Sequence, residues 1–168
     1  MAPEAREQET VYHKPLDGCN QKMTIREIQK KVADALNGVE ELVQGGCKAF
    51  AEDAKDVFFE VKQALEAGNV CIVVVTPKVT RSASGCRDGI PVEMQLAVQC
   101  AERPDLNRST PGHLTALDAA EIVAHALDGE QFEFASIEQW ADDRTRTVTA
   151  TATFGFTPIL TEPTTERN

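Results

Sequence analysis

The chain has 168 residues, enough for one domain with a sizeable buried core. Its 17 basic and 27 acidic residues give a net charge of −10, which disfavours nucleic-acid binding because such binding draws on cations that neutralise phosphates. The longest apolar run, residues 70–75, is too short to cross a membrane, and the polar, acidic N-terminus lacks the pattern of a signal peptide. We therefore expect no membrane contact, and a protein that resides in the cytoplasm or is assembled there.

A polar arm is predicted at residues 1–22. Thr24 and Glu27 then have the pattern of a capping box, in which a threonine caps a helix and a glutamate three residues later returns the hydrogen bond. Apolar residues recur at helical spacing after this box, which predicts a helix over 25–36.

The middle of the chain predicts a short edge strand around 47–51 and a second helix over 53–67. The buried face of that helix is expected to hold Val57, Val61, Ala64 and Leu65. Residues 70–79 are rich in β-branched side chains and predict one strand. Residues 90–102 alternate apolar and polar side chains, the pattern of a half-buried strand, with Val92, Met94, Leu96, Val98 and Cys100 on the apolar face. These two strands should form a long antiparallel hairpin around the polar loop 81–89.

A third helix is predicted over 114–127, with a buried face of Leu114, Leu117, Ala120, Val123, Ala124 and Leu127. Strands at 132–141 and 145–156 should form a second hairpin, in which threonines occupy one face of the last strand. The domain would span 23–160, followed by a polar tail at 161–168. The predicted fold class is α+β, a mainly antiparallel sheet with two long hairpins and helices packed on one face.

The sequence offers few groups for chemistry. The three histidines, at positions 13, 113 and 125, form no metal-binding spacing, and no phosphate-binding loop or nucleophile elbow occurs. The five cysteines (Cys19, Cys47, Cys71, Cys86 and Cys100) show no paired spacing, so neither a zinc site nor a disulfide framework is indicated. Cys71 and Cys100 occupy apolar strand positions and are predicted to be buried. We therefore expect no enzyme, no cofactor and no metal.

Two polar loops, 81–89 and 103–112, are flanked by Arg81, Arg87, Arg103 and Arg108, and the two loops could lie near one another. These arginines are either ordinary surface charge or contacts with carboxylates of a partner.

Several stretches resemble the tail-terminator and tail-completion proteins of tailed bacteriophages. They are the run 51–56 with its following helix, Gly68 and the strand 70–75, the strand 91–100 ending in Glu102-Arg103-Pro104 with Asn107-Arg108, the helix through 119–123, and the hairpin ending near Phe156. The resemblance covers about residues 24–160. It implies a structural virion protein, not an enzyme, that forms a six-fold ring on the head-proximal end of the tail tube.

Such a ring would stop tube growth and offer a joining surface to the head connector. Its partners would be further copies of itself, the tube protein and the connector, with DNA only passing through an acidic lumen. The loop tips would supply the contacts, through Arg81, Ser84, Arg87, Asp88, Arg103, Asn107 and Arg108. The alternatives are another neck protein between portal and tail, a monomeric interaction module, or a small ligand-binding or enzymatic domain that uses the two polar loops.

Overall fold

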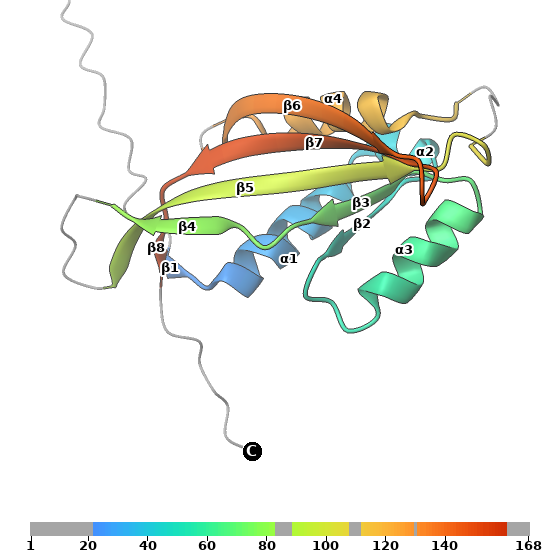
Figure 1. Cartoon of the computed structure of the whole chain (residues 1–168). Helices are drawn as coiled ribbons and strands as arrows, with labels where there is room; N and C mark the ends of the chain where they lie inside the picture. The colour runs from blue at the N-terminus through green and yellow to red at the C-terminus, as the bar shows by residue number, and fades with distance from the viewer. Residues whose placement is uncertain (1–21, 83–88, 108–111, 130, 161–168) are drawn as a thin grey trace, which may run out of the picture.

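The computed structural model describes residues 22–82, 89–107, 112–129 and 131–160 (Figure 1). The described residues form one mixed, mostly antiparallel sheet with helices, so the predicted α+β class is confirmed. The strands are β1 (Lys22–Met23), β2 (Lys48–Ala51), β3 (Cys71–Val74), β4 (Lys78–Arg81), β5 (Ile90–Glu102), β6 (Glu133–Asp142), β7 (Thr147–Phe156) and β8 (Ile159–Leu160). The helices are α1 (Ile25–Leu36), α2 (Glu40–Gln44), α3 (Val57–Glu66) and α4 (Ala116–Leu127). The predicted tail and, except for Lys22, the predicted arm lie outside the described residues.

The 13-residue strand β5 runs through the centre of the sheet, and the predicted alternation of its side chains is confirmed. On one side it pairs with β3 and β4, and on the other with β7 and β8, in each case antiparallel. The sheet continues outward to β2 beyond β3 and to β6 beyond β7. The strand predicted around 47–51 corresponds to β2, and its predicted position at an edge of the sheet is confirmed. It pairs with β3 in parallel.

Helices α1 and α4 cover one face of the sheet and form the main core with it (Figure 1). The capping box of Thr24 and Glu27 is present, and Thr115 and Asp118 form a second box at the start of α4. Hydrogen bonds from the backbone and side chain of each cap threonine hold the pKa of Glu27 and of Asp118 below its ordinary value. Each box therefore contributes stability at neutral pH that is lost as the pH falls through the lowered pKa of its carboxyl group.

Helix α3 lies on the opposite face, so the expectation that all helices pack on one face does not extend to it. Ala49 and Ile72 are register partners in the core under α1. The preceding partners, Lys48 and Cys71, must point the other way because side chains alternate along a strand. Lys48 forms an ion pair of 3.8 Å with Glu60 of α3, which sets α3 over that opposite face.

The strand predicted over 70–79 is interrupted between β3 and β4. Val74 is paired with Val98, and Lys78 is paired with Gln95. The four residue steps from Val74 to Lys78 therefore lie opposite only three residue steps of β5. One extra residue is thereby inserted, and it reverses which side chains face the core. Pro77 lies in the interruption, where its lack of an N–H removes one possible ladder hydrogen bond.

The other helices differ in smaller ways from the prediction. The short helix α2 was not predicted, and α3 begins only at Val57. Leu117, expected in the core, is 40% exposed, while Ala116 and Ala119 are fully buried, so the inward face of α4 is rotated from the predicted one. Small alanines on this face let the helix lie close to the sheet.

Candidate functional site

Those of the predicted contact residues that the structure describes lie at two opposite ends of β5. Arg81, at the end of β4, is paired with Val92 near the start of β5, and Arg103 directly follows its last residue, Glu102. A strand advances by about 3.4 Å per residue, so the two arginines are separated by about 35 Å along the sheet. The described ends of the loops 81–89 and 103–112 therefore do not lie close together. Ser84, Arg87, Asp88 and Arg108 lie outside the described residues.

At the C-terminal end of β5, a buried carboxylate accepts hydrogen bonds from Asn107 and from the start of α4. Glu102 is 6% exposed and accepts a hydrogen bond of 2.9 Å from the backbone N–H of Ala116, at the start of α4. Its other oxygen accepts a hydrogen bond from the Asn107 side chain, which also donates to the carbonyl of Leu114 at 3.1 Å. The network ties the end of β5 to α4, so Asn107 has a structural role in addition to any contact role.

Arg103, Asp105 and Arg146 form a charged cluster beside that network. Asp105 lies 3.0 Å from the guanidinium of Arg103 and 3.7 Å from that of Arg146, which precedes β7. Asp105 thus joins the loop after β5, which also holds Arg103, to the turn before β7. Arg81, by contrast, is exposed, and no ion pair connects it to another described residue.

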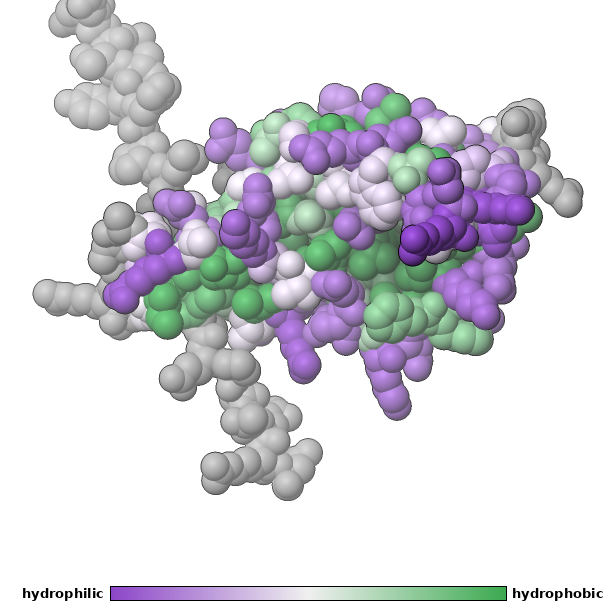
Figure 2. Space-filling view, in the orientation of Figure 1, coloured by the Kyte–Doolittle hydropathy of each residue, from purple (hydrophilic) through white to green (hydrophobic). Residues whose placement is uncertain are grey.

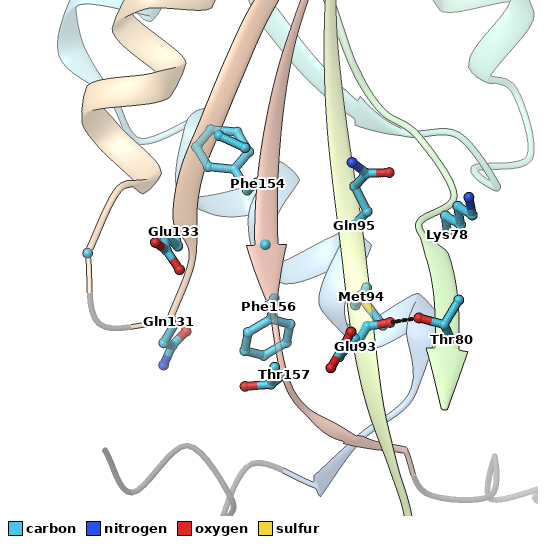
Figure 3. A pocket seen from close by; sticks show the side chains of 13 residues that line it. Lys78, Thr80, Glu93, Met94, Gln95, Gln131, Glu133, Phe154, Phe156 and Thr157 are labelled. Atoms are coloured by element: carbon cyan, nitrogen blue, oxygen red, sulfur yellow. Dashed lines mark hydrogen bonds between the residues drawn. The ribbon is translucent and has the colours of Figure 1, made fainter. Parts of the chain in front are cut away.

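The opposite end of the sheet carries a shallow trough on the face that α1 and α4 leave uncovered (Figure 3). Its volume is about 770 Å³, and its floor includes Gly155, which has no side chain. One row of paired residues crosses it, in the order Lys78, Gln95, Gly155 and Glu133. Figure 3 shows Lys78 and Glu133 at the two sides of this row, so the positive and negative charges lie apart rather than converging on one point.

The three described cysteines, Cys47, Cys71 and Cys100, are buried and free, and the predicted burial of Cys71 and Cys100 is confirmed. Burial raises the pKa of Cys47 to about 11 and that of Cys71 to about 12, and it also raises the pKa of Cys100. A thiol with so high a pKa holds almost no thiolate near neutral pH, and the thiolate is the reactive form. In the described part of the chain, no three His, Cys, Asp or Glu side chains are grouped to hold a metal ion.

We expect Cys47, Cys71 and Cys100 to resist alkylation by iodoacetamide at pH 8 in the native protein and to react fully in 6 M guanidinium. Peptide mass spectrometry would measure each site separately. Rapid labelling of any of the three in the native protein would contradict the burial of that thiol. That cysteine would then be a candidate for a catalytic or redox role.

No known protein-family model matches this sequence. A search of curated proteins also found no significant match. Among the described residues, no helix has the length and apolar character needed to span a membrane.

Exposed aromatic side chains are the main surface feature that the sequence analysis missed. Phe58 and Phe59 on α3 are 88% and 61% exposed, and Trp140 on β6 is 51% exposed. Figure 2 shows apolar residues gathered over α3 on the viewed surface. The exposure of both phenylalanines could have been predicted from the sequence, because neither belongs to the buried face that was predicted for this helix. Exposed aromatic residues of this kind are enriched where proteins meet.

Proposed function

We propose that this protein is a ring-forming tail terminator of a tailed bacteriophage, which caps the head-proximal end of the tail tube and joins it to the head connector. The resemblance described above supplies the class. The arrangement that supports it best is the separation of the two polar loop regions by the length of β5. A joining subunit must contact one partner at each end, and here Arg81 and Arg103 mark opposite ends about 35 Å apart.

The same separation weakens the ligand-binding or enzymatic alternative. That reading needs the loops 81–89 and 103–112 to form one site, and they flank opposite ends of β5. The trough beside β4 does not offer a ligand-binding or catalytic site in place of the loops. The charged side chains of the trough, Lys78, Glu93 and Glu133, lie spread across three strands.

Electron microscopy of tail tubes incubated with the purified protein tests the proposal. We expect a six-fold ring at one end only, and no further growth when tube protein is added. Arg81→Glu should weaken attachment at one end of the subunit while leaving the fold intact, because Arg81 is exposed. Lys30→Glu on α1 is the matched control, since it reverses an exposed charge outside both loop regions and away from the exposed phenylalanines of α3.

Bare tubes that continue to grow in the presence of the protein would overturn the terminator function. Binding to the isolated connector but not to tubes would instead favour the other neck protein.

A further inference from the structure

Hydrogen bonds to nearby residues occupy the outer edge of β2. Just before the strand, the N–H of Cys47 donates to the carbonyl oxygen of Leu42 at 2.9 Å. At the end of the strand, the carbonyl oxygen of Ala51 accepts from the N–H of Ala54 at 3.0 Å. Between these two positions, the backbone groups of Ala49 are bonded by a side chain instead.

Asn37, the residue that ends α1, closes this central position. Its side-chain amide donates to the carbonyl oxygen of Ala49, and its side-chain oxygen accepts from the N–H of Ala49, both at 2.9 Å. An amide fits here because it carries a donor and an acceptor side by side, whereas a carboxylate would turn an oxygen toward the carbonyl of Ala49. Because Ala49 is buried, a backbone group that loses its partner here is costly.

The residue after Asn37 is Gly38, and this pair of residues can lose ammonia without an enzyme. The backbone nitrogen of Gly38 attacks Cγ of Asn37, a cyclic imide forms, and the Cγ–Nδ2 bond breaks, so that the amide leaves as ammonia with the proton of Gly38. Water then opens the imide at either carbonyl and leaves an aspartate or an isoaspartate at position 37. Glycine favours this attack because it has no side chain to obstruct its nitrogen.

The folded chain holds the reacting groups in an unreactive arrangement. Asn37 has the helical values φ −68° and ψ −11°, and ψ must change before the nitrogen of Gly38 faces Cγ. The N–H of Gly38 is itself bonded to the carbonyl oxygen of Ala35 at 3.1 Å. Since Ala49 also fixes the Asn37 side chain, these contacts must open together before the imide can form.

We propose that Asn37 is a deamidation site that reacts only when the junction between α1 and β2 opens, and that the reaction releases the closed edge of β2. The product carboxylate cannot donate to the carbonyl oxygen of Ala49, and the two oxygens repel each other. An isoaspartate also routes the main chain through Cβ, so the end of α1 loses its course. The change is one-way and therefore accumulates in chains whose junction has opened. This inference is independent of the proposed function.

Deamidation kinetics test the dependence on opening. The protein would be incubated at pH 8 in buffer and in 6 M guanidinium, and peptide mass spectrometry would follow the exchange of –NH2 for –OH at each asparagine. We expect Asn37 to react at least about tenfold more slowly in the native protein, because reaction requires local opening. Equal rates in the two conditions would overturn this dependence. An Asn37 that stays intact in guanidinium would show that it is not a deamidation site.

Two controls test the route of the reaction in the denatured chain. Asn69 should stay intact over the same period, because the β-branched Val70 follows it and obstructs the attacking nitrogen. Gly38→Ala should slow the loss of ammonia from Asn37 for the same reason. An unchanged rate in Gly38→Ala would exclude attack by the nitrogen of residue 38.

The release of the β2 edge is tested separately with Asn37→Asp, which places one of the products in every chain. Iodoacetamide should alkylate Cys47, buried just before β2, at least about fivefold faster than in the unmodified protein, while Cys100 on the central strand keeps its slow rate. Gln139→Glu is the matched control, since it makes the same exchange of amide for carboxylate on an exposed side chain of β6. Unchanged labelling of Cys47, or equal acceleration at Cys47 and Cys100, would overturn the release of this one edge.

Discussion

Phe154→Ala is expected to lower the free energy of unfolding by about 3–5 kcal/mol. Phe154 is the largest fully buried side chain of the described residues, and it lies on β7 between Leu96 of β5 and Phe134 of β6. Truncation removes its apolar contacts and leaves a cavity that the surrounding strands cannot close, because their hydrogen bonds fix their spacing. A domain of this size is typically stable by about 5–15 kcal/mol, so the variant could retain little of its native stability.

Urea unfolding followed by circular dichroism would measure the loss. Phe134→Ala is the matched control: its ring meets that of Phe154 edge to face at 6.0 Å, but it is 39% exposed, so its truncation should cost clearly less. Equal losses for the two variants, or a loss below about 1.5 kcal/mol for Phe154→Ala, would show that the core is not packed around this residue.

Glu102→Ala is expected to lower the free energy of unfolding by about 2–4 kcal/mol. The change would leave two donors without their acceptor, the buried N–H of Ala116 and the half-buried side-chain amide of Asn107. Each unsatisfied donor costs about 1–3 kcal/mol, partly recovered where water enters. The start of α4 and the loop after β5 should loosen together.

Hydrogen exchange provides a readout specific to this network. The amide of Ala116 should exchange much faster in Glu102→Ala, while amides in the centre of β5 change only as global stability does. Glu121→Ala is the control, because Glu121 is an exposed residue of α4 and its loss should stay within about 0.5 kcal/mol. Unchanged exchange at Ala116 would contradict the role of Glu102.

The elements that follow local rules were predictable from the sequence. Strand β5 was found with its bounds and its buried face because its alternation extends over 13 residues. The start of α1 was found because Thr24 and Glu27 specify a cap through contacts three residues apart. Both signals depend on neighbours along the chain, not on the tertiary structure.

What escaped prediction depends on contacts between distant segments. The exposure of Leu117 follows from how α4 is rotated over the sheet, and no spacing within the helix distinguishes it from Ala116. The parallel pairing of β2 and the placement of α3 on the opposite face follow from the crossover between β2 and β3. Helix α2, with five residues, is too short to show a helical period.

The candidate contact residues were predictable as loop positions but not as a spatial arrangement. Both loops were recognised from polar, turn-forming residues, and the strand predicted over 90–102 already lies between them in the sequence. The length of that strand was not used to estimate the distance between Arg81 and Arg103. The structural role of Asn107 also escaped, because it depends on Glu102 and Leu114, which only the fold brings together.

The uninterrupted course of β5 has a mechanical consequence. If the two ends of the subunit are pulled apart, tension passes along one covalent strand, and the ladder that joins β5 to β7 over nine residue pairs is loaded in shear. Because these hydrogen bonds lie across the direction of pull, they share the force and must rupture together instead of opening one after another. A subunit built in this way is suited to carry a stretching load between two large structures without unfolding.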